Sequence, residues 1–140
     1  MVEDLKVADI MTTTVHVLYE EDNLEKIRKH MDKYSMRHLP VVDDEKVVGM
    51  ISHRDVLRMA VSALEPSSVA NSLDHRISET FVGAVMTRDI KTVHKNSSVR
   101  DAAKLLVSGH FGCLPVLDDS EKLVGVVTES DILKAVAHKL

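Results

Sequence analysis

The sequence is poor in aromatic residues and has no excess of positive charge. Its 140 residues include no Trp, two Phe and two Tyr, and the formal net charge is -4. Nucleic-acid binding depends on cationic side chains that meet phosphates and on aromatic rings that stack on bases. We therefore expect no DNA or RNA ligand.

The sequence also has only one cysteine, no recognisable export signal and no long apolar run. Cys113 is the single cysteine, so no internal disulfide can form, and one thiol suits a reducing compartment. The first four residues carry two acids and no apolar stretch of the kind found in an export signal, and apolar runs such as Leu123–Val127 are too short to span a bilayer. We expect a cytoplasmic protein without a membrane partner.

Sequence motifs of catalytic and metal sites are missing as well. Eight His are scattered without HxxxH or HxH spacing, and no glycine-rich phosphate loop, Ser-His-Asp order or paired catalytic carboxylates can be recognised. His110 and Cys113 lie close together in the sequence but make an incomplete metal or thiol site. The sequence predicts neither an enzyme nor a required cofactor, and a minor hydrolase or metal protein is the lowest-ranked alternative.

What the sequence does contain is an internal repeat. A shift of about 75 residues, lengthened by one near Ser120, superimposes the two halves. The shift aligns Met11-Thr12 with Met86-Thr87, Leu39-Pro40-Val41 with Leu114-Pro115-Val116, Gly49 with Gly125, and Asp55 with Asp131. We predict repeats at 7–64 and 82–138 with a connector at 65–81, and we expect Met11 and Met86 to seat the start of each repeat. A unit of this size buries little surface alone, so the two repeats should pack together.

Each repeat is predicted to run strand, helix, strand, strand, helix, which makes the fold class α/β. The segments predicted in the first repeat are a strand at Val15–Leu18, a helix at Leu24–Tyr34, a hairpin of Leu39–Val42 and Val47–Ile51, and a helix opened by Ser52 with an apolar face from Val56 to Leu64. Asp22 or Asn23 can cap the first helix, and Ser97 or Ser98 can cap its equivalent.

A short motif recurs where the last strand of each repeat gives way to a helix. It reads Gly49-x-x-Ser52-x-x-Asp55 in the first repeat and Gly125-x-x-Thr128-x-x-Asp131 in the second. A hydroxyl followed three residues later by an acid resembles the capping box that satisfies free amides at a helix start. The functional interpretation is that hydroxyl and amides face a polar ligand while the carboxylate accepts both hydroxyls of a ribose. Capping and binding can coexist.

The duplicated Met-Thr start, Leu-Pro-Val strand and Gly-x-x-Ser/Thr-x-x-Asp motif together resemble a pair of cystathionine beta-synthase (CBS) domains, the Bateman module. The resemblance covers nearly the whole chain. It implies two similar units about a pseudo-twofold axis that bind adenosyl ligands such as AMP, ATP, NAD or S-adenosylmethionine. It also implies a regulatory rather than catalytic role, a homodimer, and a separate effector protein that is not identified.

Carried over by position, the resemblance implies three groups of ligand-binding residues. Asp55 and Asp131 would hold the ribose, and Ser52 and Thr128 would approach the ribose or phosphate side of the ligand. Strands at Pro40 and Pro115 would line the adenine slot. The segments before the first strands would give backbone hydrogen bonds to the base edge; these are Thr14, Val15 and His16 in one repeat and Asp89, Ile90 and Lys91 in the other.

The two repeats differ in charge around these positions. The first carries Arg37, His38, His53 and Arg54 where the second has Gly112, Cys113, Glu129 and Ser130. The hypothesis is that a phosphorylated adenosine anchored by Asp131 meets the basic residues of the first repeat, helped by Lys91 and His110. The preferred function is sensing of AMP, ADP or ATP. The alternatives are a scaffold or regulatory subunit that binds a partner protein, and a sensor of S-adenosylmethionine or NAD.

Overall fold

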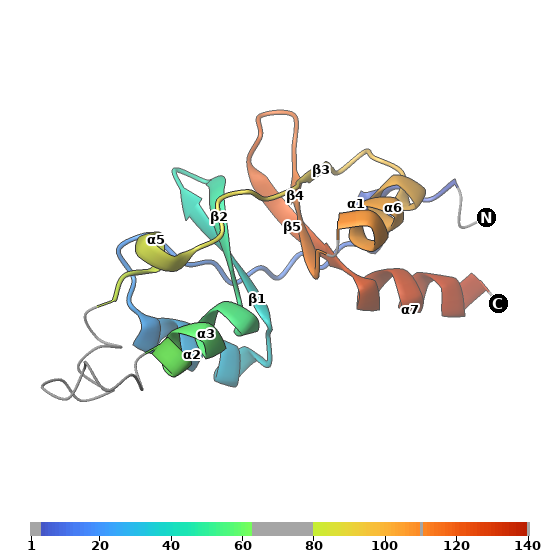
Figure 1. The fold of residues 1–140 in the computed structure, drawn as a ribbon. Helices are drawn as coiled ribbons and strands as arrows, with labels where there is room; N and C mark the ends of the chain where they lie inside the picture. The colour runs from blue at the N-terminus through green and yellow to red at the C-terminus, as the bar shows by residue number, and fades with distance from the viewer. Residues whose placement is uncertain (1–3, 63–79, 110, 140) are drawn as a thin grey trace, which may run out of the picture. The chain divides into compact units, whose positions relative to one another are not determined.

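The computed structural model describes residues 4–62, 80–109 and 111–139. The chain divides into two compact units (Figure 1). His16–Asp89 forms one, called here the Asp55 unit, and Met1–Val15 with Ile90–Leu140 forms the other, the Asp131 unit. The predicted connector at 65–81 lies outside the described residues except for Thr80 and Phe81.

The Asp55 unit is built around an antiparallel hairpin of β1 (His38–Asp43) and β2 (Lys46–Ser52). Asp43 pairs with Lys46, and the two residues between them, Asp44 and Glu45, both have positive φ. That combination is typical of the type I′ turn, whose twist matches the twist of the flanking strands. The predicted hairpin is therefore confirmed.

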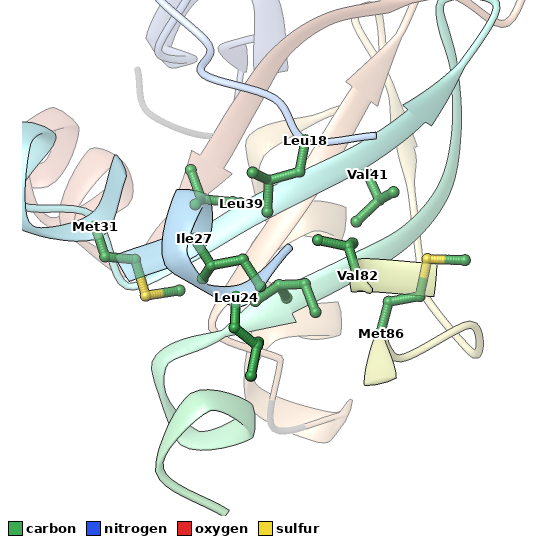
Figure 2. Packing of buried hydrophobic residues seen from close by; sticks show 9 residues of the cluster. Leu18, Leu24, Ile27, Met31, Leu39, Val41, Val82 and Met86 are labelled. Atoms are coloured by element: carbon green, nitrogen blue, oxygen red, sulfur yellow. The ribbon is translucent and has the colours of Figure 1, made fainter. Parts of the chain in front are cut away.

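Helices complete this unit. They are α2 (Leu24–Tyr34), α3 (His53–Ser62) and the short α5 (Val82–Val85). The Asn23 side chain accepts a hydrogen bond from the Lys26 amide, which makes Asn23 rather than Asp22 the cap of α2. The unit's apolar side chains converge between α2, the hairpin and α5 (Figure 2); the labelled members are Leu18, Leu24, Ile27, Met31, Leu39, Val41, Val82 and Met86.

The Asp131 unit has a three-stranded sheet in the order β3-β4-β5. Its elements are α1 (Val7–Ile10), β3 (Val93–His94), α6 (Val99–Gly109), β4 (Cys113–Leu117), β5 (Leu123–Thr128) and α7 (Glu129–Lys139). β3 runs parallel to β4, and β4 antiparallel to β5. The Ser98 hydroxyl accepts from the Asp101 amide and caps α6. The two units together confirm the predicted α/β class.

The strand predicted at Val15–Leu18 was wrong in extent. Only Leu18 pairs, in a parallel bridge with Val41, donating to the Pro40 carbonyl and accepting from the Val42 amide. The chain turns immediately afterwards, because the Asp22 carboxylate accepts from the Tyr19 amide. The equivalent segment of the second repeat reaches two residues, Val93 and His94.

The starts of the two repeats are exchanged between the units. Thr12 pairs with Val126 on β5, whereas its equivalent Thr87 pairs with Met50 on β2. The methionines follow the same rule: a β-carbon added at Gly125 would lie 2.7 Å from the Met11 sulfur, and one at Gly49 would lie 2.5 Å from the Met86 sulfur. Each methionine thus seats its repeat's start on the sheet of the other repeat.

Candidate functional site

In the Asp55 unit, the candidate site lies where β2 ends and α3 begins. Asp55 is buried, and its Oδ2 accepts hydrogen bonds from the Ser52 amide at 2.8 Å and the Ser52 hydroxyl at 3.0 Å. The Asp55 amide donates back to the Ser52 hydroxyl at 3.2 Å. The other carboxylate oxygen, Oδ1, accepts from the Arg58 guanidinium at 3.2 Å.

The Asp131 unit has the same arrangement between β5 and α7. Oδ2 of Asp131 accepts from the Thr128 amide at 3.0 Å and the Thr128 hydroxyl at 3.2 Å, and the Asp131 amide donates to that hydroxyl at 3.4 Å. Here Oδ1 accepts from the hydroxyl of Thr12, at 2.9 Å, and not from a cation. Thr12 reaches this position because its backbone pairs with Val126.

These contacts confirm the capping interpretation of the motif. In each box the aspartate closes on the hydroxyl residue that begins the helix, which satisfies amides that have no partner within the helix. Capping uses Oδ2 alone. The Oδ1 oxygen of each aspartate has one protein donor, so each carboxylate keeps acceptor capacity for a ligand.

Beside each aspartate, the first residue of a strand is a titratable group, half-buried His38 in one unit and buried Cys113 in the other. Burial lowers the pKa of the His38 imidazole, and the Arg37 guanidinium lowers it further, while the Asp55 carboxylate opposes both. His38 is therefore neutral at pH 7. His38 stays a candidate ligand-binding residue because its neutral ring can form hydrogen bonds. It does not supply a positive charge for a phosphate.

Cys113 occupies the equivalent position in the Asp131 unit. Burial and the Asp131 carboxylate raise the pKa of the Cys113 thiol to about 12. The thiol is protonated at pH 7 and unsuited to nucleophilic or metal chemistry, since both require the thiolate. Cys113 stays a predicted ligand-binding residue.

The remaining predicted cations are exposed. Arg37, His53 and Arg54 all lie in the Asp55 unit, and the His53 amide donates to the Arg37 carbonyl at 2.7 Å, which brings the ends of β1 and β2 together. Lys91 is exposed in the Asp131 unit. His110 lies outside the described residues.

The segments predicted to meet the base edge divide between the units. Thr14, Val15, Ile90 and Lys91 fall in the Asp131 unit, and His16 and Asp89 in the Asp55 unit. The His16 ring stacks on Tyr34, with centroids 3.5 Å apart and planes within 11°. Pro40 and Pro115 are buried in β1 and β4, while Gly112 and Ser130 are exposed.

Sequence reasoning missed two residues of the site, Thr12 and Arg58. Thr12 was visible as part of the repeated Met-Thr start, but nothing in the sequence said that it would reach the aspartate of the other repeat. Arg58 follows Asp55 by three residues, a spacing that places two side chains on one helix face. The contact between the Arg58 guanidinium and Asp55 could have been predicted from that spacing.

Within the described ranges, no group of three or more His, Cys, Asp or Glu is placed to hold a metal ion. In the same ranges, no helix combines the length and apolar character needed to cross a membrane.

Comparison with known proteins identifies the repeated unit. The family model described as "CBS domain" matches residues 7–62 and again residues 82–138. The chain belongs to the CBS domain family.

Curated relatives match the chain over nearly its whole length. A CBS domain-containing protein of Dictyostelium discoideum is 31% identical over 91% of this chain and 88% of its own. Two proteins of Methanocaldococcus jannaschii, MJ1232 and MJ1225, are 30% and 27% identical over 99% and 94% of this chain. The chain spans only 42% and 47% of those two proteins.

Solved CBS pairs share the fold. CBSX2, solved in complex with AMP, matches with a TM-score of 0.79 and 27% identity, covering 96% of this chain and 97% of its own. The CBS domain pair of MJ0100, solved with 5′-methylthioadenosine and S-adenosyl-L-methionine, matches with a TM-score of 0.75 and 26% identity, covering 97% and 98%. The resemblance to a CBS pair is confirmed.

Proposed function

We propose that this CBS pair is a regulatory module that binds an adenosine nucleotide, AMP, ADP or ATP, without catalysing a reaction. The observation that carries the proposal is the pair of equivalent carboxylates, Asp55 and Asp131. Each is held through Oδ2 by its own box, and Oδ1, which has one protein donor, keeps acceptor capacity for a ligand. A fixed anionic acceptor that is not saturated suits the two hydroxyls of a ribose.

The ligands named for the related structures support an adenosyl compound. AMP, 5′-methylthioadenosine and S-adenosyl-L-methionine share adenine and ribose and differ beyond the 5′ carbon. Exposed Arg37 and Arg54 favour the phosphorylated members, because guanidinium groups bind phosphate through paired hydrogen bonds. S-adenosylmethionine carries no phosphate, so a preference for it would contradict this part of the proposal.

The test is a thermal-shift screen of AMP, ADP, ATP, NAD and S-adenosylmethionine at millimolar concentration. Binding to the folded state alone raises the melting temperature, and a ligand at 100 times its Kd stabilises by about 2.7 kcal/mol. We expect a shift with at least one adenosine phosphate. No shift with any of the five compounds would remove nucleotide sensing and favour the scaffold role instead.

A homodimer is the partner that the exposed apolar side chains favour. Leu57 on α3 is 53% exposed and Leu133, its equivalent on α7, is 67% exposed. Large apolar side chains exposed at equivalent positions favour burial against a second copy. Light scattering at micromolar concentration should give the dimer mass, and Leu133→Asp should lower it, whereas Val107→Asp on α6 should not.

The effector protein and the cytoplasmic location belong to the same proposal. A module without a reaction of its own acts by changing what a partner protein does. The buried, protonated Cys113 thiol is compatible with a reducing compartment. Affinity capture with and without the ligand found in the screen should recover an effector whose retention depends on that ligand.

A further inference from the structure

The two carboxylates differ in the donor that occupies Oδ1, and this difference separates the two sites. Arg58 is the donor at Asp55, and Thr12 is the donor at Asp131. The residue equivalent to Arg58 in the second repeat is Lys134, and among the described residues it makes no ion pair with Asp131. The inference below rests on the proposed function.

The hydrogen-bonding capacity of Asp55 is nearly used up. A carboxylate offers about four acceptor positions, two on each oxygen. The amide and hydroxyl of Ser52 take both positions on Oδ2, and Arg58 takes one on Oδ1. One position remains, whereas a ribose presents two neighbouring hydroxyl protons.

Asp131 has the same count, but its third partner behaves differently. The Thr12 hydroxyl donates in the structure, yet a hydroxyl also accepts and can rotate. When a diol arrives, Thr12 can turn and accept one of its protons. A guanidinium has five donors and no acceptor, so Arg58 cannot do the same.

We infer that Arg58 is a specificity-determining residue of the Asp55 site, where its guanidinium competes with the second hydroxyl of a ribose for Oδ1 of Asp55. The competition is mild. The Arg58 side chain is 71% exposed, and exposed ion pairs of this kind alter an equilibrium by only about two- to fivefold. Arg58 therefore lowers the affinity of Asp55 for a vicinal diol without closing the site.

The inference distinguishes two nucleosides that carry no phosphate. Adenosine has both ribose hydroxyls and needs the position that Arg58 holds. 2′-Deoxyadenosine lacks the 2′ hydroxyl, and the position that is already open suffices for it. Loss of the Arg58 cation should therefore improve adenosine binding selectively.

The experiment measures both nucleosides by isothermal titration calorimetry in a chain carrying Asp131→Ala, where Asp55 is the remaining diol acceptor. Arg58→Met removes the cation and keeps an unbranched side chain, and Lys134→Met is the matched control at the equivalent position. We expect Arg58→Met to tighten adenosine about two- to fivefold and to leave 2′-deoxyadenosine nearly unchanged. Lys134→Met should alter neither affinity.

Other results overturn the inference in recognisable ways. Equal tightening of both nucleosides would mean that Arg58 acts through overall charge, and unchanged or weaker adenosine binding would mean that it does not compete. If the unaltered chain binds adenosine and Asp131→Ala abolishes that binding, Asp55 holds no diol. Binding of neither nucleoside nor AMP to the unaltered chain would instead remove the proposed function.

Discussion

At the residue scale, the electrostatic difference between the repeats is smaller than their sequences suggest. Arg37, His53 and Arg54 keep the positive character of the first repeat, but burial leaves His38 neutral at pH 7. Sequence reasoning counted His38 as a cation because burial cannot be read from a His in isolation. The aspartates and their hydroxyl partners were predictable, since duplication marked them twice.

His38 should make stability depend on pH. Its pKa is lower in the folded protein than the ordinary value of 6.5, so the unfolded chain binds the proton more tightly. The stabilising contribution is complete above pH 6.5 and is lost as the pH falls toward the folded pKa. Urea unfolding at pH 7.5 and 5.5 should show a smaller loss of stability in His38→Gln than in the unaltered chain, with exposed His138→Gln as control. An equal loss in both variants would contradict this.

The charge difference also gives a prediction for AMP. On the hypothesis that the Asp131 site favours a phosphorylated adenosine, Asp131→Ala should cost more AMP affinity than Asp55→Ala, by tenfold or more for a lost hydrogen bond to a charged acceptor. Calorimetry on the two variants compares them directly. Equal losses, or a loss only with Asp55→Ala, would refute the asymmetry.

At the element scale, local signals predicted what local contacts decide. The α2 helix begins after Asn23 and carries buried Leu24, Ile27 and Met31 at helical spacing, all of which the sequence displays. The prediction of a strand at Val15–Leu18 was wrong in extent because strand pairing depends on a partner strand and on the turn that follows. The alignment of the repeats showed the equivalent glycines of β2 and β5. It did not show why glycine is needed there, which is the close contact with a start segment.

Gly125 on β5 gives an element-scale test of that contact. A β-carbon there would lie 2.9 Å from the carbonyl oxygen of Thr12, which is backbone and cannot swing aside as a flexible side chain can. Gly125→Ala should therefore destabilise the fold by about 1–3 kcal/mol, the usual cost of overpacking. Urea unfolding measures this, with Val107→Ala, at a 76% exposed position, as control. A change no larger than that of the control would refute the close contact.

At the scale of the whole molecule, the repeats written in the sequence are not the units that fold. Alignment shows that Thr12 corresponds to Thr87 but not which copy of the sheet each one joins. Val7, from the start of the first repeat, is fully buried in the core of the Asp131 unit, and Val82 is fully buried in that of the Asp55 unit. The start of each repeat is therefore a structural part of the other.

This exchange predicts crossed effects of two matched substitutions. Val7→Ala should destabilise the Asp131 unit and Val82→Ala the Asp55 unit, each by about 2 kcal/mol for the lost methyl groups and the cavity left behind. Hydrogen exchange locates the loss: Val7→Ala should expose amides of β4 and β5, and Val82→Ala those of β1 and β2. If each substitution instead loosened the sheet of its own repeat, the exchange would be wrong. Because Thr12 on the same start segment donates to Asp131, the crossed result would also mean that the candidate ribose site at Asp131 draws on both repeats of the sequence.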